Sequence, residues 1–285
     1  MKKILKFRSM KLILGTANFN INYGKNNVKF NIKDLKNLSK FCDKKISFFD
    51  TASAYNNHKK ISNISGNLKI FSKFPLIKQL PNCVDYLIFD SLRQLKLLKI
   101  NSFYGIMFHS SSDIKILGKL GVAELKKKIK KNNISNLLGV SVYDPEELKT
   151  ILKIFKPDFI QFPLNIFDRR FLKYNLLKKL KKLNIKLISR SCFLQGQLLN
   201  NRNIFRGRDM RIYKKFSAWC TLNKISPMKG CIFFINSIPL IDFLVIGIDN
   251  FNQLKEIYKT TKVKHFLDIP NFGNVSKKCI NPRAW

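Results

Sequence analysis

The chain alternates between short apolar runs and longer segments in which apolar residues recur at helical spacing. There are eight such runs, at residues 11–16, 46–50, 69–73, 104–109, 136–141, 158–162, 185–191 and 242–249, and each ends in polar residues or glycine. A strand that is covered on both faces has a continuous apolar sequence, and strands that alternate with helices indicate a parallel sheet. The pattern therefore predicts an α/β protein built from strand–helix units.

Helical spacing follows the apolar runs along most of the chain. We expect helices at residues 32–42, 84–98, 114–131, 211–223, 228–235 and 252–260, with one more beginning within residues 57–65. Pro145 can open a further helix in its first turn, where the missing N–H has no consequence. Asp168 is suited to cap a helix that runs to Leu183. Near the N-terminus, the alternation of basic and apolar residues at 2–9 suggests a small strand or hairpin.

Eight strand–helix units in about 250 residues are typical of a (β/α)8 TIM barrel, whose chemistry lies at the C-terminal ends of its strands. We predict a single domain over residues 1–285, with the barrel at about 11–260 and a C-terminal tail at 261–285. An open doubly wound sheet is the alternative. No GxGxxG loop follows the first strand, which counts against a nucleotide-binding version of that fold.

The composition is that of a globular protein, with 45% hydrophobic and 25% charged residues, but the formal net charge is +37. An AT-rich coding sequence explains the shared abundance of Lys, Asn, Ile and Phe, and attraction to nucleic acid is the other interpretation. The densest basic runs, 126–131 and 178–182, are interrupted by Ile129 and Leu180, as on solvated faces of amphipathic helices. No aromatic residues are interleaved with these runs, so nucleic-acid binding is the less favoured interpretation.

The six cysteines are scattered without a CxxC pair, and there are only three histidines. No zinc-type cluster can be assembled from this spacing, so we expect no metal, reduced thiols and a cytoplasmic protein. The most apolar region, residues 231–248, is interrupted by Asn236, Ser237, Pro239 and Asp242, so we expect no membrane span.

The segment ISFFDTASAY, at residues 46–55, carries the candidate chemistry. A buried strand ends on Asp50, whose carboxylate must be paired because an isolated buried charge is very costly, and Tyr55 follows in the next loop. In a barrel, Asp50, Lys73 and His109 would lie at the ends of neighbouring strands, about 4.8 Å apart from strand to strand. Lys73 could then lower the pKa of the Tyr55 phenol while Asp50 holds Lys73. His109 could donate a hydrogen bond to a carbonyl oxygen that accepts negative charge.

Each of these four residues also has an ordinary structural explanation. The aspartate can cap a turn, the lysine can lie on the surface, the histidine can be a satisfied core residue, and the tyrosine can pack in a loop. The functional interpretation depends on finding all four residue types at consecutive strand ends.

The ordered motifs GTA, DTASAY, SK, FH, GVSVY, IQFPLN, RSCFLQG and VIGIDN resemble those of the aldo/keto reductases over about residues 12–258. Members of that family are NAD(P)(H)-dependent (β/α)8 oxidoreductases. The resemblance implies that Asp50, Tyr55, Lys73 and His109 form the catalytic tetrad, with Tyr55 as the general acid when hydride reduces a small carbonyl compound. The segment RSCFLQG is most similar to members found with sugar and polysaccharide pathways, which suggests a sugar-derived substrate.

The resemblance also implies a site for NADP(H) or NAD(H). Ser141 and Gln161 would hold the nicotinamide carboxamide near Gly15 and Thr16, and Arg190 stands where many members have a ring-stacking tyrosine. Four residues would lie beside the pyrophosphate: Ser191, Phe193, Gln195 and Gly196. Four more would lie beside the adenosine: Gly247, Asp249, Gln253 and Glu256.

Several positions differ from the family pattern: Asn56, His58, Lys59, Val142, Gln253 and Ile257. Asp249 would repel an adenosine 2′-phosphate but can accept a hydrogen bond from a ribose hydroxyl, so the choice between NAD and NADP stays open. The differences also suggest an alternative function, a non-catalytic barrel that binds nucleotide and acts as a regulatory or interaction protein. The sequence gives no indication of an oligomeric state.

Overall fold

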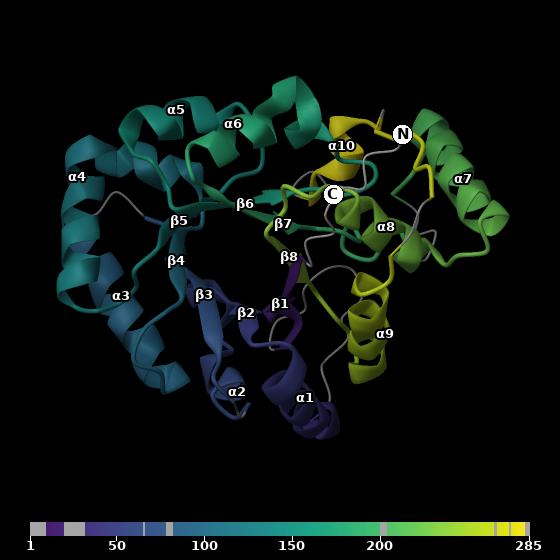
Figure 1. Ribbon diagram of the computed structural model, residues 1–285. Coiled ribbons are helices and arrows are strands. Elements are labelled where there is room, and N and C mark those ends of the chain that lie inside the picture. The colour runs from purple at the N-terminus through teal and green to yellow at the C-terminus, as the bar shows by residue number, and fades with distance from the viewer. Residues whose placement is uncertain are drawn as a thin grey trace.

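Eight parallel strands form a closed barrel in the order β1 to β8, and β1 pairs with both β2 and β8 (Figure 1). This computed structural model describes residues 10–19, 32–64, 66–77, 82–199, 204–264, 267–273 and 275–282. The small strand or hairpin expected at residues 2–9 lies outside the described residues. The prediction of a (β/α)8 barrel is confirmed, and the open doubly wound sheet is excluded because β1 and β8 are hydrogen-bonded to each other.

Each strand lies in one of the eight predicted apolar runs, although β6 extends one residue past its run. The strands are β1 (Lys11–Gly15), β2 (Phe48–Asp50), β3 (Lys69–Lys73), β4 (Gly105–Phe108), β5 (Leu138–Ser141), β6 (Phe159–Pro163), β7 (Lys186–Arg190) and β8 (Phe243–Ile246). Most of their residues are buried, as expected of strands whose outer face is covered by helices and whose inner face fills the barrel.

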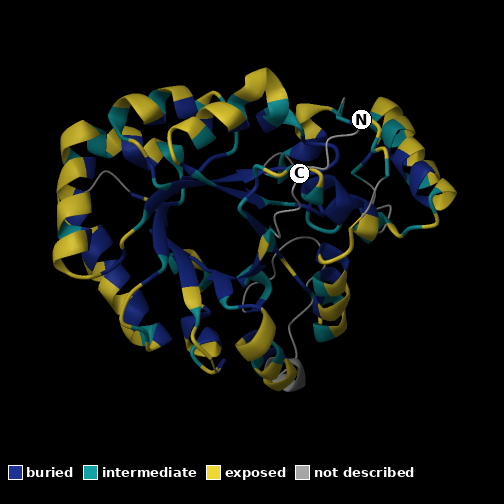
Figure 2. Ribbon diagram, in the orientation of Figure 1, coloured by how far each residue is buried: buried dark blue, intermediate teal, exposed yellow. Residues whose placement is uncertain are grey.

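Helices surround the strands, with their buried residues turned toward the barrel and their exposed residues outward (Figure 2). The α-helices are α1 (Ile32–Lys45), α2 (His58–Ile61), α3 (Cys83–Leu98), α4 (Ser111–Lys131), α5 (Glu147–Ile154), α6 (Leu176–Lys182), α7 (Gly207–Leu222), α8 (Pro227–Asn236), α9 (Phe251–Thr261) and α10 (Lys277–Ile280). Short 3-10 helices occur at η1 (Ala17–Phe19), η2 (Ser53–Tyr55) and η3 (Arg170–Asn175). The predicted helices are present, with ends that differ by a few residues.

The helix expected to open at Pro145 is present as α5, which begins two residues later. The turn at Pro145 leads into it, because Glu147 accepts from the backbone N–H of Asp144, and Oδ1 of Asp144 accepts from the N–H of Glu146. The helix start expected at Asp168 is wrong. Asp168 accepts from the N–H of Arg170, the first residue of the short helix η3, which ends at Asn175. Tyr174 and Asn175 then adopt left-handed backbone angles, both with φ of 55°. A left-handed residue interrupts a right-handed helix, so α6 begins only after them.

Aromatic rings fill the interior of the barrel toward the N-terminal ends of its strands. Phe71 contacts the rings of Phe159 and Phe243, with centroids 5.1 and 5.6 Å apart. Glycines make room for these rings, because a Cβ atom on Gly139 would lie 2.5 Å from Phe159, and one on Gly105 would lie 2.8 Å from Phe71. The aromatic rings therefore occupy the barrel interior near the N-terminal ends of the strands, and polar side chains occupy it near the C-terminal ends.

The segment expected as a C-terminal tail is packed against the outside of the barrel. Phe272 is buried, and its ring lies 5.8 Å from that of Phe216 and 6.1 Å from that of Trp219. The indole N–H of Trp219 donates to the carbonyl of Asp268 over 3.1 Å. The apolar residues of α10 are buried as well, so this segment adds to the core.

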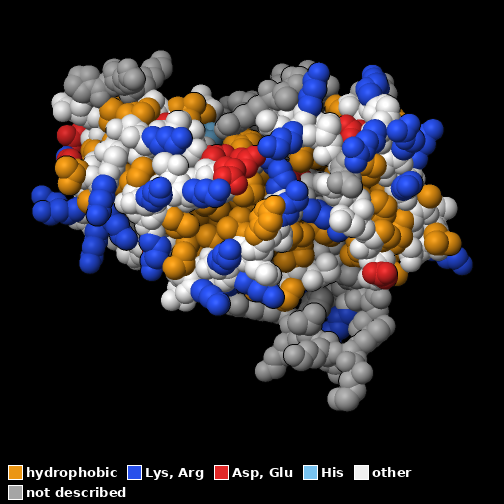
Figure 3. Space-filling model, turned by 90° about the horizontal axis from the view of Figure 1, so that it is seen from above, with side chains coloured by type: hydrophobic (Ala, Val, Ile, Leu, Met, Phe, Trp, Pro, Cys, Tyr) orange, Lys and Arg blue, Asp and Glu red, His pale blue; other side chains and the backbone are white. Residues whose placement is uncertain are grey.

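The two basic runs lie on α4 and α6, as predicted, with Ile129 and Leu180 buried and most of the lysines exposed. The space-filling view shows Lys and Arg side chains scattered over one face of the molecule and not gathered into a single stripe (Figure 3). In the part of the chain that the structure describes, no helix is both long enough and apolar enough to cross a membrane.

Candidate active site

The four residues expected to carry the chemistry lie together at the C-terminal end of the barrel. Asp50 ends β2, Lys73 ends β3, His109 follows β4, and Tyr55 ends the short helix after β2. The Nζ atom of Lys73 is 2.5 Å from Oδ2 of Asp50 and 5.4 Å from the centroid of the Tyr55 ring. The rings of Tyr55 and His109 meet edge to face, with centroids 6.4 Å apart. The fold therefore brings these four side chains together, as predicted.

The carboxylate of Asp50 is buried but fully engaged. Oδ2 accepts from Lys73, and Oδ1 accepts from Nε2 of Gln161 over 2.7 Å. Lys73 also donates to the carbonyl of Thr51 over 3.2 Å. Burial lowers the pKa of Lys73 below its ordinary value, Asp50 opposes that shift, and the positive charge of Arg190 adds to it. Asp50 and its partners thus hold the lysine ammonium in one position below the tyrosine ring.

The loop that carries Tyr55 is held by a residue that the sequence analysis missed. Asn57 is buried, and its amide donates to the carbonyl of Thr16 over 2.6 Å and accepts from the hydroxyl of Thr51 over 2.9 Å. Thr16 in turn donates from its hydroxyl to the carbonyl of Asp50 over 2.9 Å. Asn56 adopts a left-handed conformation with φ of 50°, which asparagine tolerates better than most residues, so this position does not require the glycine usual in the family pattern.

His58, another departure from the family pattern, is buried behind the tetrad. Its Nε2 lies 3.1 Å from Oε1 of Gln94 on α3, and that same oxygen accepts from the hydroxyl of Ser72, the neighbour of Lys73. Gln94 also donates to Asp90 over 2.7 Å. Burial lowers the pKa of His58, so the neutral imidazole is favoured. The sequence pattern did not indicate this network, because its members come from three separate elements.

A cavity of about 290 Å³ extends from the tetrad toward α9. Asp50 and Tyr55 line one part of it, and Glu256 and Ile257 line another. Of the residues expected to bind the cofactor, these line the cavity: Gly15, Gln161, Arg190, Ser191, Phe193, Gln195, Gly196, Gly247, Asp249, Gln253 and Glu256. The two others do not: Thr16 binds the loop described above, and Ser141 lies at the end of β5, opposite Gln161 in the strand register.

Asn18, which the sequence analysis did not identify, joins two loops at the cavity. Its amide lies 3.3 Å from Oδ1 of Asp249 and 3.4 Å from the carbonyl of Ile248. On the other side of Asp249, the backbone N–H donates to Oε1 of Gln253 over 2.8 Å. Asn18 lies in the loop after β1 and Asp249 in the loop after β8, so no local sequence signal could have indicated this contact.

The lining suits an extended nicotinamide dinucleotide. Of the tetrad, Asp50 and Tyr55 line the cavity, together with the amide of Gln161 and the guanidinium of Arg190, whereas Lys73 and His109 do not. Carboxylate and amide groups line the region near α9. Gly15 and Gly247 also line the cavity. A Cβ atom on Gly15 would lie 3.1 Å from the Ile246 carbonyl, so a glycine at this position lets β1 lie close to β8. Within the described residues, no group of His, Cys, Asp or Glu side chains could hold a metal ion.

The sequence model of the aldo/keto reductase family matches residues 81–271. Among solved structures, an aldo-keto reductase from Bacillus halodurans in its holo form has a TM-score of 0.73 at 14% identity, covering 95% of both chains. A glycerol dehydrogenase from Gluconobacter oxydans has a TM-score of 0.69 at 16% identity, covering 90% of this chain and 87% of its own. No curated protein matches the chain significantly. At such identities the likeness to the solved structures shows a shared fold.

Proposed function

The chain belongs to the aldo/keto reductase family, and we propose that it reduces a small carbonyl compound to an alcohol with Tyr55 as the general acid. Membership of the family makes it an oxidoreductase acting on small carbonyl compounds, and members generally use NAD(P)H. The observation that carries the assignment of the acid is the placement of the Lys73 ammonium 5.4 Å from the ring of Tyr55, with Asp50 holding the lysine.

In the proposed reaction, the bound cofactor supplies a hydride to the carbonyl carbon. Tyr55 then gives the proton of its hydroxyl to the carbonyl oxygen, and Lys73 stabilises the phenolate that remains. Asp50 keeps the ammonium group in place. His109, whose ring meets that of Tyr55 edge to face, is suited to donate a hydrogen bond to the same oxygen as negative charge develops on it.

The proposed cofactor contacts follow the cavity. Gln161 would bind the nicotinamide end, although its Nε2 also donates to Asp50. Ser191, Phe193 and Gln195 would border the pyrophosphate, and Asp249 and Glu256 would face the adenosine, by the family pattern and by their position in the lining. Neither Thr16 nor Ser141 borders the cavity. Thr16 is proposed to act through the loop that it supports, and Ser141, opposite Gln161 in the strand register, keeps its proposed role at the nicotinamide end by the family pattern alone.

For the substrate, we propose a small, polar, sugar-derived aldehyde or ketone. The resemblance of the segment at residues 190–196 to members found with sugar pathways supports this, and the fold is shared with a protein described as a glycerol dehydrogenase. A panel should therefore include glyceraldehyde, dihydroxyacetone and several aldoses.

The test is to replace Tyr55 with Phe, which removes the acidic proton and keeps the ring. We expect turnover of NADPH or NADH with the best carbonyl of the panel to fall by about 10²- to 10⁴-fold, because general-acid catalysis contributes factors of that size. Cofactor dissociation constants, measured by calorimetry, should stay within about twofold. Tyr86→Phe is the matched control, since Tyr86 lies on α3 with 42% of its surface exposed. Undiminished turnover by the Tyr55 variant would exclude Tyr55 as the acid.

A non-catalytic nucleotide-binding barrel is the second candidate. It is favoured by the residues that differ from the family pattern at the adenosine end, Gln253 and Ile257, which both line the cavity. Saturable nucleotide binding without turnover of any carbonyl in the panel would support this candidate over the first.

A further inference from the structure

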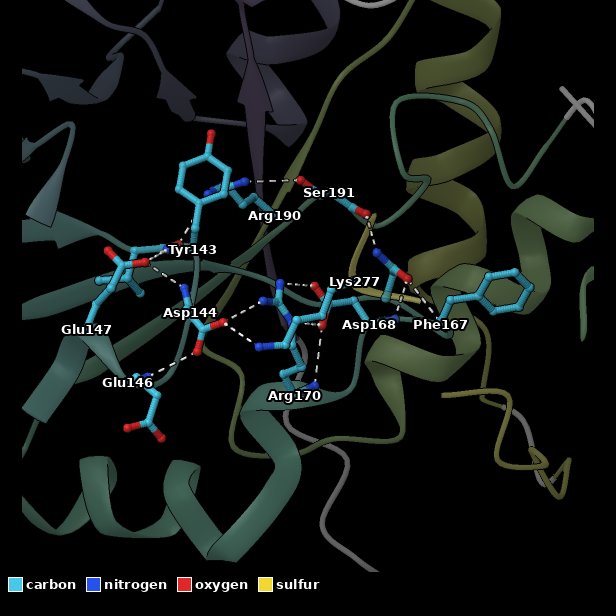
Figure 4. Close-up of polar contacts among 12 residues, drawn as sticks. Tyr143, Asp144, Glu146, Glu147, Phe167, Asp168, Arg170, Arg190, Ser191 and Lys277 are labelled. Atoms are coloured by element: carbon cyan, nitrogen blue, oxygen red, sulfur yellow. Dashed lines mark hydrogen bonds and ion pairs between the residues drawn. The ribbon is translucent and has the colours of Figure 1, made fainter. Parts of the chain in front are cut away.

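Arg190 is the cationic side chain that borders the cavity at the end of β7, and it is held in a defined orientation. Its guanidinium carbon lies 4.1 Å from the centroid of the Tyr143 ring. Nη2 donates to the carbonyl of Val142 over 3.2 Å, and Nη1 lies 3.3 Å from the hydroxyl of Ser191 (Figure 4). A guanidinium stacked on a ring and hydrogen-bonded on two nitrogens presents a flat, positively charged surface.

The loop that carries Tyr143 is fixed in turn. The backbone N–H of Tyr143 donates to Oε1 of Glu147 over 2.9 Å, and the next residue, Asp144, pairs with Arg170 over 3.0 Å. Arg170 also pairs with the buried carboxylate of Asp168 over 2.8 Å (Figure 4). The support beneath Arg190 is therefore built from buried and half-buried ion pairs, and the guanidinium is not a mobile surface group.

The charge of Arg190 is not neutralised locally. Among the described residues, Asp50 is paired with Lys73, and no carboxylate forms an ion pair with Arg190. Asp50, Lys73 and Arg190 together therefore carry one net positive charge beside the reacting centre. The influence of Arg190 reaches that centre, because its charge contributes to the lowered pKa of Lys73.

A nicotinamide ring is neutral when reduced and carries one positive charge when oxidised. By the family pattern, the nicotinamide ring would lie at the end of the cavity that Asp50, Tyr55, Gln161 and Arg190 line. We propose that Arg190, held on Tyr143, makes the site bind the reduced dinucleotide more tightly than the oxidised one and so favours carbonyl reduction over alcohol oxidation. This inference rests on the proposed function, because it requires that the cavity binds a nicotinamide dinucleotide.

The expected size follows from the electrostatics. Two unit charges about 5 Å apart at an effective dielectric constant of about 20 interact strongly enough to change an equilibrium by more than tenfold. Delocalisation of both charges weakens the interaction, so we expect the dissociation constant of the oxidised form to exceed that of the reduced form by roughly tenfold. A tenfold ratio makes the midpoint potential of the bound two-electron couple about 30 mV more positive than that of the free couple.

The experiment is calorimetric titration of the full-length protein with NADH, NAD⁺, NADPH and NADP⁺. The quantity compared is the ratio of the oxidised to the reduced dissociation constant. Arg190→Gln removes the charge, and Arg190→Tyr is a second neutral variant in case the first does not fold. Arg190→Lys retains the charge. We expect the ratio to fall about tenfold in both neutral variants and to stay within about threefold of the wild-type value in the lysine variant.

A control for overall charge is required, because the reduced dinucleotide carries one more negative charge and the protein has a net charge of +37. Lys186→Gln removes one charge from the opposite end of the same strand, β7, and should leave the ratio unchanged. Titration at about 0.15 M and 0.5 M salt further separates the contribution of Arg190 from that of the overall net charge. Long-range attraction is screened over about 8 Å at the lower concentration and over a shorter distance at the higher one.

The possible outcomes separate the inference from the proposed function. If none of the four nucleotides binds the wild-type protein, the proposed cofactor site is wrong, and the inference falls with it. If nucleotides bind but a folded neutral variant keeps the wild-type ratio, the role of Arg190 is refuted while the proposed function stands. If Lys186→Gln lowers the ratio as much as Arg190→Gln, the preference comes from overall charge and not from Arg190.

Discussion

Replacing Lys73 with Met removes one partner of the buried ion pair at the base of the candidate site. Both charged groups are almost fully buried, and the Lys73 Nζ–Asp50 Oδ2 distance is 2.5 Å. Methionine has nearly the same length and shape as lysine, so the substitution removes the charge and three hydrogen-bond donors without leaving a large void. Asp50 would keep only the hydrogen bond from Gln161.

The expected loss in the free energy of unfolding is about 3–5 kcal/mol, the range found when one partner of a buried pair is removed. Most of this loss comes from a carboxylate that is left buried without a counter-charge. The double variant Lys73→Met with Asp50→Asn removes that charge and keeps an acceptor for Gln161. It should therefore recover at least about half of the lost stability, because replacing a whole buried pair by neutral groups is often close to neutral.

The assay is equilibrium unfolding in urea, followed by circular dichroism, with turnover measured in parallel. Both variants should lack activity, although only the single variant is strongly destabilised. A loss below about 1 kcal/mol in the single variant would refute the argument that the substitution leaves a buried and otherwise uncompensated charge.

Two further predictions concern residues outside the candidate site. Gly139→Ala should lower the free energy of unfolding by about 1–3 kcal/mol, because its Cβ would lie 2.5 Å from the ring of Phe159, and Phe159→Leu in the same chain should recover part of the loss. In urea unfolding the control Gly121→Ala, which meets only the flexible side chain of Leu117, should lose less, and equal losses would contradict this account. Burial raises the pKa of Asp113 to about 6, above its unfolded value, so its destabilising effect is absent below about pH 4 and complete above about pH 6. Asp113→Asn should therefore increase stability by about 1–2 kcal/mol at pH 8 and much less at pH 4, and a gain of the same size at both values would exclude this cause.

Local patterns in the sequence were sufficient to predict the barrel and the meeting of the tetrad. Strands covered on both faces are continuous apolar runs, so the strands could be located from composition over a few residues. Parallel strands place their C-terminal ends at one edge. Asp50, Lys73 and His109, each at the end of its run, therefore had to lie near one another once the strands were placed in order. Tyr55 follows Asp50 too closely to lie elsewhere.

One helix beginning was predicted wrongly. Asp168 has the residue type expected at a helix start, but in the folded chain Tyr174 and Asn175 adopt left-handed angles that interrupt the helix after it. This interruption cannot be read from residue type alone.

The contacts that shape the candidate site depend on residues far apart in the chain. Asn18 meets Asp249 across 231 positions, and the guanidinium of Arg190 is hydrogen-bonded to the carbonyl of Val142, 48 positions away. Periodicity records only which face of an element is apolar, whereas the partner of a polar side chain depends on which loops the closed barrel brings together. The amino-acid pattern by itself therefore determines the strands and the edge at which the chemistry lies. The pairing of Arg190 with Tyr143 arises only when β5, β6 and β7 lie side by side, and that of Asn18 with Asp249 arises only when β1 and β8 close the barrel.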